Sequence, residues 1–413
     1  MTEKEKVIKA FAEYSQPAKA KMWQEYGMAL VLGRREGPYM WDMDDGQPFF
    51  NLHTNGGTYN LGHRNPEIIR VVKEALDEID IGNGHLISKA RGELAEMLAG
   101  LMPGDLRYTI FGVSGGEAVD LAIKVARGFT KRATIISAVG GYHGHTGLAL
   151  ATGDAKYRDP FGPQPPGFKQ VPFADINSLE KAIDGHTAAV ILETVPATLG
   201  IAVPPPDYYP AVRDLCTRKG ILLIMDEVQT GFGRTGKLWA FEHYGIIPDI
   251  VVLGKGSSGG IYPITATVLR EPLIHIFDDD PFAHVSTFGG SEIGCRVMQK
   301  VLEISSAPAF LDHVNSLAKI FSDGAEELRR KHGGIFVRLR QLGLFMGLEL
   351  ADEFSSMMLC ATAYRNGLFM VYANNERKVC QCLPPLIISH SEAHEILERL
   401  DKSLDEVKRL RDG

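Results

Sequence analysis

Several features that would mark a specialised class of protein are scarce or missing in this sequence. The 413 residues contain five cysteines, an odd number scattered over a long chain, which argues against a disulfide framework and for a reducing compartment. No apolar run reaches membrane-spanning length, and the polar start MTEKEKVIKA is no secretory signal. A formal net charge of −7 gives general nucleic-acid binding no electrostatic support. We therefore expect a cytoplasmic protein that binds neither nucleic acid nor a membrane.

The composition is that of an ordinary globular protein, with 45% hydrophobic and 23% charged residues, and the length predicts two or three domains. Two apolar runs, Ile221–Met225 and Ile250–Leu253, predict buried strands of a parallel sheet. Asp226 follows the first run, and Lys255 follows the second after one glycine. Ligands of open α/β sheets bind at the carboxyl ends of the strands, so we expect this acid and this lysine in one site.

An acid and a lysine placed in this way suit pyridoxal 5'-phosphate. The lysine can form a Schiff base with the aldehyde of the cofactor, and the acid keeps the ring nitrogen protonated. At about 4 Å and an effective dielectric constant near 20, two opposite charges attract by about 4 kcal/mol, which is enough to hold the charge on the ring. Each residue alone has a simpler interpretation, as a surface lysine and a strand-end cap. The arrangement of the two favours a cofactor site.

A glycine-rich loop in the same stretch imitates a nucleotide site. Residues 231–236 (GFGRTG) match G-x-G-x-x-G, and Gly236-Lys237 nearly completes a phosphate loop. Leu238 stands where a phosphate loop requires Ser or Thr, and Glu227–Thr230 separate the first glycine from the strand. We therefore do not expect a nucleotide here.

A second glycine-rich loop lies between the predicted strand Tyr108–Phe111 and a predicted helix. Ser114 and Glu117 form a capping-box pattern around Gly115 and Gly116. The free N–H groups and the positive dipole at such a helix start can bind an anion such as a phosphate group. From the residues alone, an ordinary helix cap and a phosphate site both remain open.

Taken together, DEVQTGFGRTG, the Lys255 segment LGKGSSGGIYP, the Ser114 motif and the later STFGG resemble the class III aminotransferases of fold type I. The resemblance extends from about Gly37 to Pro385. It implies an α/β fold with a large domain on a mostly parallel seven-stranded sheet flanked by helices, and a small α+β domain. We expect residues 1–60 to pack on the small domain, 61–305 to form the large domain that binds pyridoxal phosphate, and 306–413 to form the small domain.

Local patterns add detail to this division. Residues 1–36 are expected to be helical and then irregular, and Gly37–Phe50 predicts a hairpin that turns at Asp45-Gly46. Glu67–Ile79 predicts the helix that follows, and Ser391–Leu410 predicts a last amphipathic helix.

The resemblance also implies the site residues. Lys255 and Asp226 are the expected catalytic pair. Tyr142 would stack on one face of the ring and Val228 on the other, Gln229 would lie at the ring hydroxyl, and His143 would border the cofactor. The full set of expected cofactor-binding residues is Ser114, Gly115, Gly116, Tyr142, His143, Glu193, Asp226, Val228, Gln229, Lys255, Ser286 and Thr287.

Three of these assignments leave alternatives. Glu193 ends a predicted strand and could simply bond to a loop, and Ser286 and Thr287 could belong to an ordinary loop. In the family, the matching segment reaches the phosphate of the neighbouring subunit, which implies a homodimer with shared sites. His143 and His145 lack a third metal ligand nearby, so no metal is expected.

The substrate is indicated by what the family pattern lacks here. Gln381, three residues before Pro384-Pro385, stands where amino-acid aminotransferases of this class place the arginine that clamps the α-carboxylate. Val371 stands where some amine-active relatives place a mobile arginine, and Thr198 and His145 replace a glutamate and an arginine of ornithine aminotransferases. We therefore expect an amine, a β- or ω-amino acid, or a larger specialised compound as donor, with a keto acid as acceptor.

The expected reaction is ping-pong transamination, with Lys255 as the Schiff-base lysine and as the base that moves the proton. A racemase or aminomutase of the same class is the alternative, because it would use the same Lys255 and Asp226. Such an isomerase needs no second keto substrate. A cofactor-free protein on the same fold is a third hypothesis, and it predicts a colourless protein.

Overall fold

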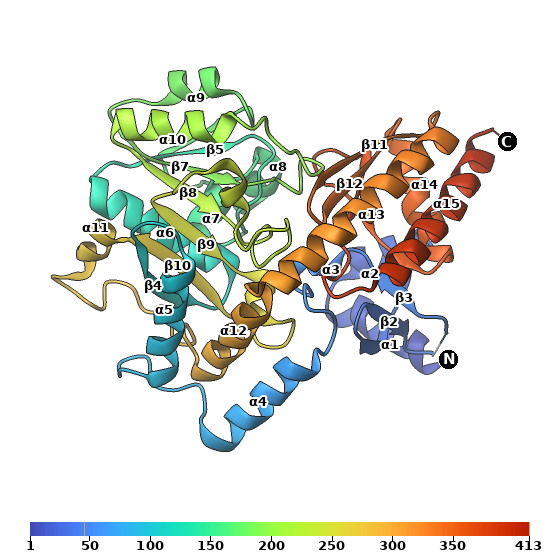
Figure 1. Cartoon of the computed structure of the whole chain (residues 1–413), viewed down its shortest axis with the longest axis horizontal. Helices are drawn as coiled ribbons and strands as arrows, with labels where there is room; N and C mark the ends of the chain where they lie inside the picture. Colours follow the sequence, from blue (N-terminus) through green and yellow to red (C-terminus); the bar gives the residue numbers. More distant parts are fainter. Residues whose placement is uncertain (45, 413) are drawn as a thin grey trace.

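The computed structural model describes residues 1–44 and 46–412 (Figure 1). Its centre is a seven-stranded sheet in the order β4-β10-β9-β8-β7-β5-β6. The pairs from β9 through to β6 are parallel, whereas β10 runs antiparallel to both β9 and β4. The expected mostly parallel sheet is therefore confirmed. Its strands are β4 (Leu106–Gly112), β5 (Thr134–Ala138), β6 (Phe168–Val171), β7 (Thr187–Glu193), β8 (Leu222–Asp226), β9 (Ile250–Leu253) and β10 (Thr265–Arg270).

Helices cover both faces of this sheet, which explains the continuous apolar runs of its strands. Along β8, Leu223 and Met225 belong to one hydrophobic cluster and Ile224 to another on the opposite face. The helices of this part are α4 (Pro66–Glu78), α5 (Lys89–Leu101), α6 (Gly115–Thr130), α7 (Gly147–Ala151), α8 (Ala155–Arg158), α9 (Ile176–Ala182), α10 (Tyr208–Lys219), α11 (Glu271–Ile274) and α12 (Glu292–Ser305), with the 3-10 helices η1 (Asp159–Phe161), η2 (Ala240–Tyr244), η3 (Lys255–Ser258) and η4 (His275–Phe277).

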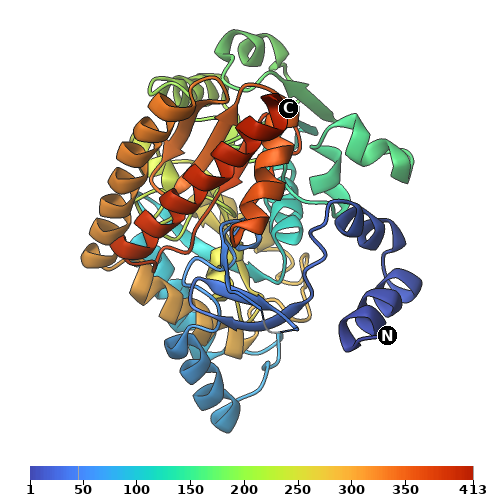
Figure 2. The same cartoon turned by 90° about the vertical axis from the view of Figure 1, so that its right-hand side faces the viewer.

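The C-terminal part forms a second layered unit beside the first (Figures 1 and 2). A four-stranded sheet in the order β11-β12-β15-β14 packs against three long helices. These elements are α13 (Pro308–His332), β11 (Phe336–Leu342), β12 (Phe345–Leu350), α14 (Glu353–Arg365), β14 (Val371–Tyr372), β15 (Val379–Cys382) and α15 (His390–Asp412).

The N-terminal segment joins this second unit through a small sheet in the order β1-β2-β3-β13. β13 (Leu368–Phe369) pairs in parallel with β3 (Phe49–Asn51), and Phe50 and Leu52 lie in the same hydrophobic cluster as residues of α13 and α15. These contacts join the N-terminal segment to the C-terminal unit, and the division at residues 60 and 305 stays a proposal. The remaining N-terminal elements are α1 (Glu3–Tyr14), α2 (Pro17–Glu25), β1 (Leu32–Glu36), β2 (Tyr39–Asp42) and the single turn α3 (Thr54–Gly57).

One local prediction was wrong. The segment before Gly37 does not end irregularly, because Leu32–Glu36 forms β1 and pairs antiparallel with β2. This edge strand is mostly exposed and reads LGRRE, so it has no apolar alternation by which it could be recognised. The hairpin of β2 and β3 is confirmed, while Asp45 of its expected turn lies outside the described residues. No helix of the described chain is both long and apolar enough to cross a membrane.

Candidate functional site

Polar side chains meet where three neighbouring strands end. Glu193 ends β7 directly opposite Asp226 at the end of β8, and Lys255 follows β9 after Gly254. These side chains line a cavity of about 380 Å³. The cavity lining consists of Ser114, Gly115, Gly116, Tyr142, His143, Gly144, His145, Thr146, Glu193, Val195, Asp226, Val228, Gln229, Thr230 and Lys255.

Ten of the twelve expected cofactor-binding residues line this cavity. The two that do not are Ser286 and Thr287, which lie in the segment between η4 and α12. Their role at the site of a second subunit stays a prediction. Thr146 and Val195 also line the cavity although no motif indicated them. Thr146 directly follows the Tyr142–His145 motif, so extending that motif by one residue would have found it.

Asp226 is held by a buried histidine. His143 Nδ1 lies 2.8 Å from Asp226 Oδ2, and the backbone N–H of Val228 donates to Asp226 Oδ1 at 3.0 Å. Burial lowers the pKa of His143, but the hydrogen bond and charge of Asp226 outweigh it, so the pKa is raised. A proton that stays on His143 keeps Asp226 ionised. The pair can therefore hold a positive charge on a ring nitrogen.

Glu193 supplies a second carboxyl group on the same side of the cavity. Its Oε1 accepts the backbone N–H of Tyr142 at 2.8 Å, and its side chain is buried. Burial raises the pKa of Glu193 to about 7, although the nearby His143 opposes the shift. Near neutral pH this group exchanges a proton readily, which suits a position beside reacting groups.

Lys255 adopts a backbone conformation that is uncommon for a residue with a side chain. Its φ is +47°, in the left-handed region, and such strain often accompanies a functional site. Its Nζ donates to Gln229 Oε1 at 3.3 Å. Burial lowers the pKa of Lys255, although Asp226 and Glu193 oppose the shift. The amine is thus neutral more often than a surface lysine, and only the neutral amine can attack an aldehyde.

A tight turn of the N-terminal segment packs on this lysine. Thr54 and Asn55 have φ values of +49° and +52°, and Gly56 follows with +67°. A Cβ atom on Gly56 would lie 3.2 Å from Lys255 Cε and 3.2 Å from Gln229 Nε2. The Asn55-Gly56-Gly57 run signalled backbone freedom, but nothing in the sequence placed it against the lysine.

The start of α6 forms a cradle for an anion. Ser114 Oγ accepts the backbone N–H of Glu117 at 3.3 Å, as expected of a cap, while Glu117 reaches back to Val113 N–H at 2.7 Å and not to Ser114. A Cβ atom on Gly116 would lie 2.6 Å from Thr146 Oγ1, so only glycine leaves this space open. The glycine-lined helix start, the lysine and the buried acid together fit the phosphate, aldehyde and ring nitrogen of pyridoxal phosphate.

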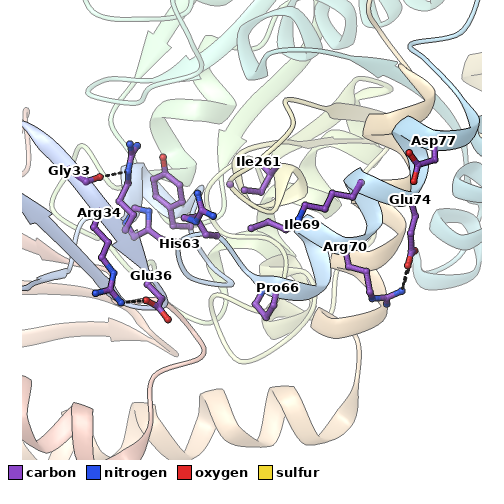
Figure 3. A pocket seen from close by; sticks show the side chains of 15 residues that line it. Gly33, Arg34, Glu36, His63, Pro66, Ile69, Arg70, Glu74, Asp77 and Ile261 are labelled. Carbon is purple, nitrogen blue, oxygen red and sulfur yellow. Dashed lines mark hydrogen bonds and ion pairs between the residues drawn. The ribbon is translucent and has the colours of Figure 1, made fainter. Parts of the chain in front are cut away.

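A larger, open cavity of about 970 Å³ lies between β1 and α4 (Figure 3). Arg34 pairs with Glu36 there, and Arg70 pairs with Glu74 at 3.0 Å. None of the expected site residues lines it. Because the expected acid, lysine and glycine-rich helix start meet only in the smaller cavity at the strand ends, that cavity is the better candidate for chemistry.

The positions that bear on the substrate lack an arginine. Gln381 is buried, and its Nε2 lies 3.5 Å from the carbonyl oxygen of Ala197. Val371 lines a separate apolar cavity beside α2 and α14. Lys255 is the only lysine or arginine among the described residues that line the strand-end cavity.

Comparison with known proteins agrees with this site. Residues 22–404 match the family described as Aminotransferase class-III. An uncharacterized aminotransferase of Archaeoglobus fulgidus is 52% identical, with 97% of this chain and 94% of that protein covered. A putrescine aminotransferase of Pectobacterium atrosepticum is 31% identical, with 99% and 92% covered. The ornithine aminotransferase of Toxoplasma gondii, whose structure shows pyridoxal phosphate at its active site, has a TM-score of 0.91 at 26% identity, with 99% and 96% covered.

Proposed function

The chain belongs to the class-III aminotransferases, pyridoxal-phosphate enzymes of fold type I, and from this membership we propose that its donor is a primary amine or diamine without an α-carboxylate. The observation that carries the proposal is the cavity lining, whose described residues include no arginine. Gln381, at the family's clamp position, is turned to a backbone oxygen. An α-carboxylate would thus lose its bidentate partner.

Two further observations support an amine donor. Asp226 gives the cavity an acidic group, which attracts a positively charged donor more than an anionic one. The putrescine aminotransferase among the relatives acts, by its name, on a diamine.

We propose the following roles for the residues of this chain. Pyridoxal phosphate, when bound, supplies an aldehyde that carries the amino group and a ring that withdraws electrons. Lys255 Nζ would accept the proton that leaves the substrate carbon and would deliver it to the former aldehyde carbon of the cofactor. Asp226, charged and oriented by His143, would hold a proton on the ring nitrogen. The N–H groups at the start of α6 would bind the phosphate.

The assembly that we propose is a homodimer with shared sites. Several large apolar side chains flank Ser286 and Thr287 or lie on the nearby segment before α5, and all are exposed in the single chain: Leu86, Ile87, Phe282, Val285 and Phe288. Exposed apolar patches of this kind commonly mark an interface. We also propose a cytoplasmic location, since all five cysteines are free thiols.

A matrix of donors and acceptors tests the donor proposal. Putrescine and ornithine differ only in the α-carboxylate, so they form a matched pair, with pyruvate and 2-oxoglutarate as acceptors. We expect kcat/KM to be at least about tenfold higher for putrescine, because ornithine that reacts through its α-amine would place its carboxylate among cavity-lining residues that include no arginine. An equal or higher value for ornithine would overturn the proposal. Conversion of an amino acid without any keto acid would instead identify an isomerase.

A further inference from the structure

One lysine near the rim of the cavity has no role in the proposed chemistry. Lys156, on the short helix α8, donates from Nζ to the carbonyl oxygen of Asn374 at 3.4 Å and to Asn375 Oδ1. Both asparagines belong to the loop between β14 and β15. The lysine therefore links the large parallel-sheet unit to the C-terminal unit.

Asn375 is itself fixed at the edge of the site. Its Nδ2 donates to the carbonyl oxygen of Gly140 at 2.7 Å. Its backbone N–H donates to the carbonyl oxygen of Thr198 at 2.9 Å. Gly140 lies two residues before Tyr142, which lines the cavity. Asn375 thus connects Lys156 to the segment that carries Tyr142.

A row of aromatic rings leads from Lys156 to the cavity. Lys156 Nζ lies 4.8 Å from the ring centroid of Tyr157, and that ring lies 5.5 Å from the ring of His145. His145 lies 5.1 Å from Tyr142, and both line the cavity. Neither Lys156 nor Tyr157 lines the cavity itself, so the ammonium group lies outside the lining, beyond His145.

The charge of Lys156 is not neutralised within the chain. Its two hydrogen-bond acceptors are amide oxygens, and it forms no ion pair with any acid of residues 1–44 and 46–412. Arg377, on the same loop as Asn375, differs in this respect. It lies 3.7 Å from Glu353 and 5.2 Å from the ring centroid of Tyr372. Lys156 is the better cation for an incoming anion.

Building on the proposed function, we propose that Lys156 is the specificity-determining residue for the acceptor, and that it binds the distal carboxylate of a dicarboxylic keto acid. The reacting carbonyl of such an acceptor must approach the Lys255 end, so its far carboxylate points to the rim. A keto acid without a second carboxylate cannot use this contact. A diamine donor brings its distal ammonium to the same end, where Lys156 repels it.

The test compares Lys156→Met with the wild-type holoenzyme. With 2-oxoglutarate we expect kcat/KM to fall about tenfold, the typical loss when a charge-assisted hydrogen bond is removed. With pyruvate we expect a change within about twofold. For putrescine we expect an unchanged or slightly higher kcat/KM. General damage to the fold would lower kcat/KM for every substrate. A fall for 2-oxoglutarate without a fall for putrescine therefore indicates a contact with the acceptor.

Two variants complete the experiment. Lys181→Met removes an exposed lysine of α9 and should change neither acceptor. Lys156→Arg keeps the charge and should keep most of the preference for 2-oxoglutarate. Equal losses with both acceptors, or none, would overturn the proposal. A wild-type enzyme that prefers ornithine to putrescine would overturn the donor proposal alone, because the acceptor ratio would still be measured with ornithine.

Discussion

At the scale of single residues, the sequence indicated which groups meet in the strand-end cavity but not how they are held. Lys255 and Asp226 could be predicted because each follows a recognisable buried strand, and strand ends of a parallel sheet meet at one edge. The hydrogen bond from His143 to Asp226 joins residues 83 positions apart, and no local pattern encodes it. The same is true of Gly56, whose contact with Lys255 depends on the docking of the N-terminal segment.

Lys255→Ala should abolish turnover and the visible absorbance of the lysine-bound cofactor, because both depend on the ε-amine. The matched control is Lys237→Ala, which removes the lysine of the apparent phosphate loop. Lys237 Nζ donates to the carbonyl oxygen of Glu242 at 3.0 Å, and Lys237 does not line the cavity. Absorbance spectra and initial rates of both variants decide the matter. Normal turnover by the first variant would contradict our assignment of Lys255.

Glu193→Gln should change how stability depends on pH in the cofactor-free protein. Since burial raises the pKa of Glu193 to about 7 from its usual 4.5, the folded protein holds this proton longer than the unfolded chain does. The contribution of Glu193 to the free energy of unfolding is therefore most favourable below about pH 4.5, and it is lost as the pH rises to about 7. The full effect is about 3 kcal/mol. The free energy of unfolding, measured with denaturant, should decrease less between pH 5 and pH 7.5 for the variant than for the wild-type protein.

Glu398→Gln, an exposed change on α15, is the control for that experiment and should reproduce the wild-type pH dependence. If Glu193→Gln also reproduces it, Glu193 does not hold its proton at neutral pH.

At the scale of elements, the two glycine-rich loops, residues 231–236 and the start of α6, differ in the contacts that they make. The loop of residues 231–236 connects the large parallel-sheet unit to the N-terminal segment and the C-terminal unit. Arg234, fully buried in it, donates from Nη1 to the carbonyl oxygens of Leu344 and Pro384 and from Nη2 to Asn60 Oδ1. Gly233 and Gly236 have φ values of +85°. The structural role of this loop could not be predicted from its own sequence, because it depends on contacts with the C-terminal part.

The other loop, at the start of α6, should be sensitive to one methyl group. In Gly116→Ala the new Cβ would meet Thr146 Oγ1 at 2.6 Å and intrude on the phosphate cradle, so we expect the cofactor Kd to rise at least about tenfold. Gly100→Ala on α5 meets nothing within 4 Å and should leave the Kd unchanged. Titration with pyridoxal phosphate measures both. Equal affinities of Gly116→Ala and wild type for pyridoxal phosphate would contradict our assignment of the phosphate to this helix start.

At the scale of the whole molecule, two apolar runs indicated a parallel sheet and the resemblance to class III aminotransferases implied the rest of the fold, whereas two irregular strands could not be predicted. β1 is exposed, and β10 runs against the parallel direction of its neighbour β9, so neither obeys the pattern of a buried parallel strand. The association of residues 49–52 with the C-terminal core depends on pairing with β13, more than 300 residues away. Such pairing leaves no trace in local periodicity.

The proposed dimer makes a prediction that only a shared site can satisfy. In Thr287→Asp the new carboxylate would repel the phosphate bound in the partner, so the variant should be inactive, and Lys255→Ala is inactive for its own reason. In a mixed dimer one site would combine Lys255 from the first variant with Thr287 from the second. Co-expression with two affinity tags should therefore give mixed dimers with up to about half of the wild-type activity, because one of two sites is intact.

The matched control for this experiment pairs Lys255→Ala with Asp226→Asn. Both residues come from the same chain in the structure, where they line one cavity, so no arrangement of these two subunits creates an intact site. Mixed dimers of that pair should stay inactive. Activity only in the pair with Thr287→Asp means that the loop of residues 286–287 serves the neighbouring site. Inactivity of both mixtures, with mixed dimers verified by mass, would assign each site to a single chain, and the exposed apolar residues around Thr287 would then need another explanation.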